Sequence, residues 1–176
     1  MSSAVSPLVP TSPQKLARLQ EILRSLDRVV VAFSGGVDST FLLRVAADTL
    51  PGEVTALTAV SPSLPEADRL RAGQLARAMG VQQIVARSHE LDDPNYAANP
   101  ANRCYFCKNE LYRLCQEQAG VLGVPAILDG TNVDDLADHR PGHRAAAERG
   151  VRSPLVEAGL TKADIRALSR DMGLET

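Results

Sequence analysis

The chain has 176 residues, of which 44% are hydrophobic and 23% charged, enough for one ordinary domain with a sizeable core. Aromatic residues make up only 3% and the net charge is −2, so the composition argues against a stacking platform or a basic surface for nucleic acid. There is no apolar run of about 18 residues, and three cysteines do not suggest a disulfide framework. We therefore expect no membrane span and a cytoplasmic location.

Residues 1–13 are rich in Ser and Pro and lack the features of a secretory signal, so we expect a disordered tail. Beyond it, apolar runs that predict strands alternate with amphipathic runs that predict helices. Strands are predicted over 29–33, 54–60, 81–86 and 125–128, and a loop over 88–100. Helices are predicted over 14–26, 39–50, 65–79, 103–119 and 160–172, the last with Thr161 as its N-cap and Gly173 at its end. This alternation predicts an α/β fold with a parallel sheet flanked by helices, in which ligands bind beyond the carboxyl ends of the strands.

The segment SGGVDS, which starts at Ser34, lies between the first predicted strand and the next helix. Gly35 and Gly36 allow close backbone approach, and a helix N-terminus offers free N–H donors, which together make a phosphate cradle. Ser34 and Ser39 add hydroxyl groups, and Asp38 indicates a metal ion bridging carboxylate and phosphate oxygens. The alternative is a tight turn without a ligand. The pattern is neither a Walker A loop nor a dinucleotide fingerprint.

A second polar cluster, DGTNVDD, starts at Asp129 after the fourth predicted strand. Gly130 permits a close approach and Thr131 offers a short polar side chain beside the same crevice. The carboxylates of Asp129, Asp134 and Asp135 concentrate negative charge, which fits a phosphate site if Mg²⁺ or basic side chains neutralise it. An Asx-rich turn that caps a helix is the alternative, above all for Asp134 and Asp135.

Basic residues follow this cluster. Arg140 is the best candidate for a phosphate or carboxylate ligand because it lies nearest the acidic loop, although a solvated basic face is the alternative. His139 and His143 have the spacing of helical zinc ligands. Pro141 and Gly142 between them argue against a regular helix, and therefore against a zinc site.

The three cysteines lie in or after the segment NRCYFCK. Cys104 and Cys107 form a C-x-x-C pair, for which redox, metal and simple buried roles all stay open. For Cys115 burial is the favoured interpretation, and it lies about 16 Å along a helix from Cys104, too far for a disulfide. Arg103 and Lys108, which flank the pair, could lower a thiol pKa or reach phosphates.

These motifs together resemble known families. SGGVDS resembles the PP-loop of the N-type ATP pyrophosphatases, which include NAD and GMP synthetases. NRCYFCK, DGTNVDDLADHRPG and SPLVEAGLTKADIRALSRDMGL, in this order after SGGVDS, resemble LarE, the ATP-dependent sacrificial sulfur transferases of nickel-pincer cofactor synthesis, from about Leu16 to the end. The closing segment is also similar to part of NAD synthetase. The resemblance implies a Rossmann-like fold of the adenine nucleotide alpha hydrolase type.

The resemblance also implies an activity. ATP adenylylates a carboxylate of a pyridinium mononucleotide and releases pyrophosphate; a cysteine then attacks the acyl adenylate and loses its sulfur, leaving dehydroalanine and a thiocarboxylate. The implied cofactors are ATP and Mg²⁺, and the partners a pyridinium dicarboxylate mononucleotide and further copies of the chain, without nucleic acid or membrane.

The implied roles map onto this sequence as follows. The catalytic residues are Asp38, Lys108 and Arg140, with Asp38 also binding Mg²⁺. The substrate-binding residues are Arg103 and Asp134. The ATP-binding residues are Ala32, Ser34, Gly35, Gly36, Asp38, Ser39, Ala59, Gly130, Thr131 and Lys162.

One departure from the family pattern concerns the sulfur donor. Family members continue into a segment that carries the sacrificial cysteine and then into a second domain, whereas this sequence ends at Thr176. We therefore expect residues 14–176 to form the PP-loop domain, with the C-terminal sulfur-transfer domain missing from this chain. The alternatives are an NAD-synthetase-like amidating ligase and a non-catalytic ATP-binding module. The composition argues against a third, a tRNA thiolase.

Overall fold

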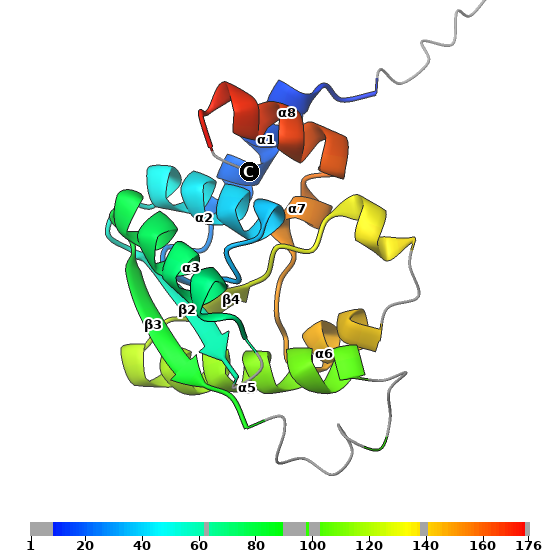
Figure 1. Cartoon of the computed structure of the whole chain (residues 1–176). Helices are drawn as coiled ribbons and strands as arrows, with labels where there is room; N and C mark the ends of the chain where they lie inside the picture. Colours follow the sequence, from blue (N-terminus) through cyan, green and yellow to red (C-terminus); the bar gives the residue numbers. More distant parts are fainter. Residues whose placement is uncertain (1–8, 62–63, 90–97, 99–102, 138–140, 175–176) are drawn as a thin grey trace, which may run out of the picture.

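The computed structural model describes residues 9–61, 64–89, 98, 103–137 and 141–174, in which four strands form a parallel sheet with the order β3-β2-β1-β4 (Figure 1). The strands are β1 (Val29–Ala32), β2 (Val54–Val60), β3 (Gln82–Arg87) and β4 (Ala126–Leu128). The predicted helices are all present, as α1 (Ser12–Arg24), α2 (Val37–Thr49), α3 (Glu66–Ala78), α5 (Arg103–Leu122) and α8 (Lys162–Asp171). The predicted α/β fold is therefore confirmed.

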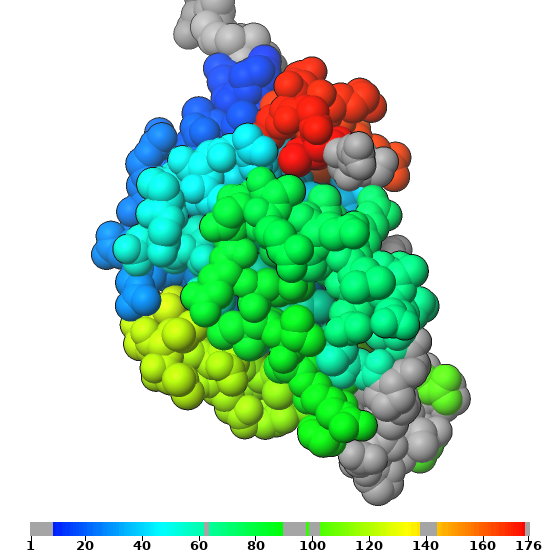
Figure 2. Space-filling model, turned by 60° about the vertical axis from the view of Figure 1, so that its left-hand side comes forward, coloured from blue at the N-terminus to red at the C-terminus, as the bar shows by residue number. Residues whose placement is uncertain are grey.

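Helices cover both faces of the sheet (Figure 1). One face packs against α5 and α6 (Pro141–Glu148), and the other against α2 and α3, with α1, α8 and the short α7 (Pro154–Glu157) packed beyond them. Figure 2 shows the edge of the sheet where α3 and β3, in green, form the surface below α2, in cyan. In the described part of the chain, no helix is both long and apolar enough to cross a membrane.

The burial of β1 on both faces of the sheet explains why the run VVVAF is apolar at every position. Val31 and Phe33 pack into the core beneath α1, α2 and α8, whereas Val30 and Ala32 pack into the core beneath α5 and α6. Successive side chains of a strand point to opposite faces, so a strand covered on both sides buries every residue. Each fully buried Val side chain stabilises the fold by about 1.5–3 kcal/mol relative to exposure.

The connectivity places a crevice beside β1. The chain passes from β1 to β2 and β3 on one side, and then returns to place β4 on the other side of β1. Val31 pairs with Leu128, so the segments that leave β1 and β4 start next to each other. Ligands of open α/β sheets bind outside the carboxyl ends of the strands at such a reversal.

Helix starts differ from the prediction by up to two residues; α2 begins at Val37, against a predicted start at residue 39, and α8 at Lys162, against residue 160. The helix α1 begins at Ser12, two residues early, because the Gln14 side chain accepts a hydrogen bond from the Thr11 amide at 2.9 Å and Pro13 is tolerated in a first turn. The sequence does not predict the helix α6, because Pro141 and Gly142 argue against a regular helix. In the structure Pro141 is the first residue of α6, a position at which the missing amide proton costs the helix no hydrogen bond.

A partly buried ion pair joins α1 to α8. Asp164 accepts hydrogen bonds from Lys15 Nζ at 2.6 Å and Ser12 Oγ at 2.5 Å, and its Oδ2 also accepts from the amide of Thr161 at 3.0 Å. Thr161 in turn accepts from the Asp164 amide, which confirms it as the N-cap of α8. Burial acts to raise the pKa of Asp164, but the hydrogen bonds from Lys15, Ser12 and Thr161 outweigh it and hold that pKa well below 3.8.

We expect this pair to make stability depend on pH. Because the pKa of Asp164 is lower in the folded chain, its contribution is fully present above about pH 4 and is lost as the pH falls through its folded value. In thermal unfolding between pH 7 and pH 3, Asp164→Asn should start less stable, by about 1–3 kcal/mol, and lose less stability on acidification than the wild type. Asp171→Asn, at the exposed end of the same helix, is the matched control. Equal acid sensitivity of the wild type and Asp164→Asn would contradict the assignment.

Candidate active site

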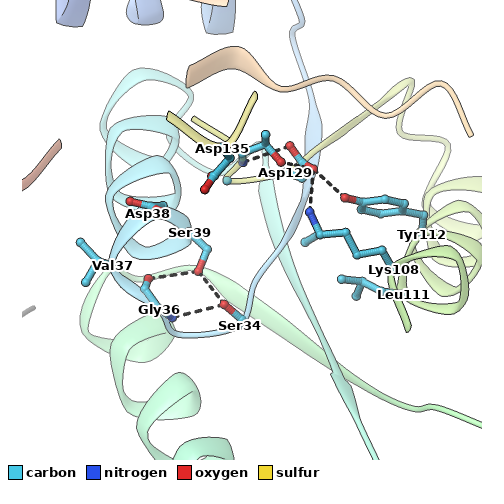
Figure 3. Close-up of a pocket in the computed structure, with 13 residues that line it drawn as sticks. Ser34, Gly36, Val37, Asp38, Ser39, Lys108, Leu111, Tyr112, Asp129 and Asp135 are labelled. Carbon is cyan, nitrogen blue, oxygen red and sulfur yellow. Dashed lines mark hydrogen bonds and ion pairs between the residues drawn. The ribbon is translucent and has the colours of Figure 1, made fainter. Parts of the chain in front are cut away.

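A cavity of about 250 Å³ lies at the β1/β4 reversal, between the segment after β1, the N-terminus of α2, the helix α5 and the loop after β4 (Figure 3). Its lining comes from three segments that are far apart in the sequence, 32–39, 108–112 and 129–135. The lining residues are Ala32, Ser34, Gly36, Val37, Asp38, Ser39, Lys108, Leu111, Tyr112, Asp129, Gly130, Thr131 and Asp135. The two motifs singled out in the sequence therefore meet in one cavity.

The SGGVDS segment forms a tight loop that leads into α2. Gly35 has φ +78°, a left-handed conformation that favours glycine, and a Cβ there would lie 3.3 Å from Ala72 of α3. Ser34 Oγ lies 3.1 Å from Ser39 Oγ and accepts a hydrogen bond from the Gly36 amide at 3.3 Å. The N-cap of α2 is Gly36, which has no side chain to cap the first turn, so the amides of that turn and the helix dipole are available to an anion.

The loop after β4 packs closely against the start of α2. A Cβ on Gly130 would lie 2.9 Å from the amide nitrogen of Ser39 and 3.0 Å from its Cα, closer than real contacts allow. Only glycine therefore lets the two segments approach as they do. The next residue, Thr131, is 6% exposed and lines the cavity.

Acidic side chains gather at the α2 end of the cavity. Asp38 accepts a hydrogen bond from Asn132 Nδ2 at 3.0 Å, and Asn132 Oδ1 accepts from the amides of Asp134 and Asp135, which begin the short 3₁₀ helix η3 (Val133–Leu136). Burial and the charge of Asp135 raise the pKa of Asp38 above its ordinary value, against the opposing effects of Asn132, Lys162 and Arg166. Two carboxylates that repel each other beside a helix N-terminus that can hold an anion could together bind a divalent cation.

A second hydrogen-bonded network forms the cavity wall on the side of α5. Asp129, 4% exposed, accepts hydrogen bonds from Tyr112 Oη at 2.6 Å, Thr131 Oγ1 at 2.8 Å and Ser153 Oγ at 2.7 Å. Lys108 Nζ lies 4.0 Å from its Oδ2 (Figure 3). Burial and the nearby carboxylate of Asp129 raise the pKa of Tyr112 far above 10, so its hydroxyl stays protonated.

The structure brings most of the predicted site residues together. Lining the cavity are Ala32, Ser34, Gly36, Asp38, Ser39, Lys108, Gly130 and Thr131, and Gly35 shapes the loop. Lys162 does not line the cavity but pairs with Asp135 at 3.0 Å. Asp134 accepts from the Lys162 amide at 2.6 Å, so it holds the start of α8.

Two further predicted residues lie away from this cavity, and Arg140 is not among the described residues. Ala59 is on β2 beside Val60, which lines a second cavity of about 500 Å³ at the carboxyl ends of β2 and β3. Arg103 is the exposed first residue of α5. His139 also lies outside the described residues.

The cysteines divide into two kinds. Cys115 is buried as predicted, and burial, followed by the charge of Asp129, raises the pKa of its thiol to about 12. Cys104 and Cys107 are exposed, so the buried interpretation is wrong for them, because the buried side chains of α5 start only at Tyr112. None of the three, all of which are described, forms a disulfide.

Sequence reasoning missed Tyr112 and Leu111. Both line the cavity from α5, four and three residues after Lys108, and therefore lie on the same face of that helix. That spacing was the available signal. The spacing alone does not show that α5 crosses the sheet beside the β1/β4 reversal, so it could not identify these residues as part of the site.

Known proteins match both the sequence and the fold. The chain is 46% identical over 91% of its length to an uncharacterized protein of Synechocystis sp., and 38% identical over 93% of its length to the pyridinium-3,5-bisthiocarboxylic acid mononucleotide synthase of Lactiplantibacillus plantarum. It spans 60% of the length of each of these relatives. The solved structure of NMN synthetase from Francisella tularensis matches 95% of the chain and 73% of its own, with a TM-score of 0.67 and 19% identity. No protein-family model matches the chain.

The parallel sheet and the glycine-rich loop after β1 define a PP-loop domain with the Rossmann-like fold of the NMN and NAD synthetases. Within this class, the match to the mononucleotide synthase and the order of the motifs show that the chain belongs to the LarE family over the part of the family's length that it spans.

Proposed function

We propose that the chain is the ATP-activating part of an ATP-dependent sacrificial sulfur transferase that acts on a carboxylate of a pyridinium mononucleotide. The observation that carries this proposal is the cavity at the β1/β4 reversal, where an uncapped helix start faces paired carboxylates and a lysine. The pyridinium substrate comes from the name of the relative in L. plantarum and rests on that kinship.

In the proposed first step, a carboxylate oxygen of the substrate attacks the α-phosphorus of ATP, and the bond to pyrophosphate breaks. The amides of the SGGVDS loop and the start of α2 hold the departing phosphates, where developing negative charge needs fixed donors. Lys108, which lines the cavity, and Lys162, which pairs with Asp135, supply positive charge, and Arg140 is proposed to assist them. The adenosine extends toward Ala59 on β2.

The residues present fit one Mg²⁺ ion. Asp38 and Asp135 supply two carboxylates, and no group of three His, Cys, Asp or Glu side chains able to hold a metal occurs among the described residues. Magnesium is commonly bound by one or two carboxylates together with substrate phosphates and waters, so a cage made only of protein is not required. When bound, the ion would neutralise charge on the phosphate oxygens.

In the proposed second step, a cysteine thiolate attacks the acyl carbon and expels AMP. Removal of the cysteine α-proton then breaks its Cβ–S bond, which leaves dehydroalanine on the protein and a thiocarboxylate on the product. Arg103 and Asp134 are proposed to contact the substrate. None of the chain's three cysteines lies at the position of the family's sacrificial cysteine, so in this proposal the sulfur comes from outside residues 1–176.

Product analysis tests the first step. The full chain is mixed with Mg-ATP and pyridinium-3,5-dicarboxylate mononucleotide, and the phosphorus products are followed by NMR together with exchange of labelled pyrophosphate into ATP. We expect exchange that depends on the carboxylate substrate, and AMP rather than ADP. ADP with phosphate would rule out the proposed cleavage, an amide formed from added ammonia would favour the amidating ligase, and ATP binding without exchange would favour a binding module.

A further inference from the structure

The carboxylate of Asp129 is saturated with neutral hydrogen-bond donors. Its Oδ1 accepts from Ser153 Oγ at 2.7 Å and from the Thr131 amide at 3.2 Å. Its Oδ2 accepts from Tyr112 Oη at 2.6 Å and from Thr131 Oγ1 at 2.8 Å. A carboxylate offers about four lone-pair sites, two on each oxygen, so these donors occupy all of them.

This saturation explains the position of Lys108. Its ammonium lies 4.0 Å from Asp129 Oδ2, beyond the 2.7–3.2 Å of ordinary N–H···O hydrogen bonds. The side chain of Asp129 is only 6% exposed, so solvent screens its charge poorly. That charge therefore still attracts the ammonium. Lys108 is one-third exposed, and its side chain extends from α5 along the cavity wall toward Asp129 (Figure 3).

The other two lysines make a useful contrast. Lys15 and Lys162 are the only other lysines of the chain, and each lies within direct hydrogen-bond distance of its carboxylate, at 2.6 Å from Asp164 and 3.0 Å from Asp135. In the described part of the chain, the carboxylate of Asp164 accepts from three neutral donors, which are Ser12 Oγ and the amide and hydroxyl of Thr161, and Lys15 is its fourth donor. At Asp129 a neutral group takes that fourth place. Lys108 is therefore the lysine that is attracted to a carboxylate without being bound to it.

We propose that Asp129 is a positioning residue for Lys108: it keeps the ammonium at the cavity wall by charge alone, and so releases it readily to a phosphate oxygen of a bound nucleoside triphosphate. Tyr112 contributes to this positioning, because its hydroxyl occupies a lone pair of Asp129 Oδ2 that would otherwise accept a hydrogen bond from Lys108. The inference rests on the proposed function for the identity of the ligand, but the positioning can be tested without any nucleotide.

Two substitutions should affect Lys108 in opposite directions. Tyr112→Phe frees a lone pair on Oδ2, so the ammonium should close to hydrogen-bond distance and exchange its protons more slowly with water. Asp129→Asn removes the charge, so the ammonium should become mobile and exchange faster. Ser153→Ala removes a donor from Oδ1, the oxygen farther from Lys108, and Tyr105→Phe removes a hydroxyl of α5 that instead donates to Glu148, so both serve as matched controls.

Nitrogen-15 NMR of the lysine ammonium groups measures this directly, because only three signals are expected and Lys108→Arg identifies one of them. Without nucleotide, Tyr112→Phe should sharpen the Lys108 signal and Asp129→Asn should broaden it, while the signals of Lys15 and Lys162 stay unchanged. If the Lys108 signal is the same in both variants and in the wild type, the positioning role is overturned, whether or not the signal shifts when ATP is added. A change of equal size in Ser153→Ala would show general loosening of the wall and would also overturn it.

Addition of Mg-ATP then tests the release. In the wild type the Lys108 signal should shift on binding, and Tyr112→Phe should weaken ATP binding about three- to tenfold, as expected for one competing hydrogen bond. An unshifted Lys108 signal with ATP bound would overturn the release, even if the spectra without nucleotide agree. Absence of ATP binding in the wild type would instead contradict the proposed function, and the spectra without nucleotide would still decide the positioning.

Discussion

Replacing Asp38 with asparagine is expected to reduce Mg²⁺-dependent pyrophosphate release by at least about 100-fold, comparable to the loss of one strong electrostatic contact in an active site. Asparagine keeps an oxygen that can accept the hydrogen bond from Asn132, so the local geometry should persist. What disappears is the negative charge, and with it the proposed magnesium ligand. Pyrophosphate–ATP exchange, measured across a magnesium titration, reports the loss.

The same substitution should not destabilise the fold. Burial and the neighbouring Asp135 raise the pKa of Asp38, so its ionised form is unfavourable in the folded chain, and a neutral residue removes that repulsion at neutral pH. We expect an unchanged or higher melting temperature. Asp48→Asn, at the exposed end of the same helix, is the matched control and should keep full activity. Full activity of Asp38→Asn, or a large drop in its melting temperature, would contradict this assignment.

Replacing Gly130 with alanine is expected to disrupt the cavity and to lower stability by about 1–3 kcal/mol. The added Cβ would meet the backbone of Ser39 at 2.9 Å, and a helix start cannot move aside as a flexible side chain can. The loop after β4 must therefore shift away from α2. Because the first turn of α2 is the proposed phosphate cradle, ATP binding should weaken together with stability, as measured by calorimetry and thermal unfolding.

Gly120→Ala is the control for this prediction. Gly120 is an exposed residue within α5, and a Cβ there would meet nothing within 4 Å. Alanine is the better helix former, so this variant should be more stable by about 0.5–1 kcal/mol with unchanged ATP binding. Equal effects of the two substitutions would show that the close approach at Gly130 does not matter.

Much of the fold could be predicted because the local signals agree with the tertiary structure. The apolar run that contains β1 predicted a strand buried on both faces, and the pattern of α8 predicted both the helix and its cap at Thr161. The prediction failed at Pro141, where one residue type is compatible with two outcomes, a helix break and a helix start. For Cys104 and Cys107 the sequence left several roles open, and the structure shows both exposed, because the buried side chains of α5 start only at Tyr112.

The sequence by itself determined the glycine-rich loop that is the proposed phosphate cradle, because SGGVDS, the strand before it and the helix after it are contiguous and their geometry is local. Only the tertiary structure decided which distant residues face that loop. Asp38 and Asn132 are 94 positions apart, and they meet because β4 pairs with β1 rather than with β3. Lys108, Tyr112 and Asp129 likewise form one wall only because α5 packs across these strands, and no local pattern specifies that packing.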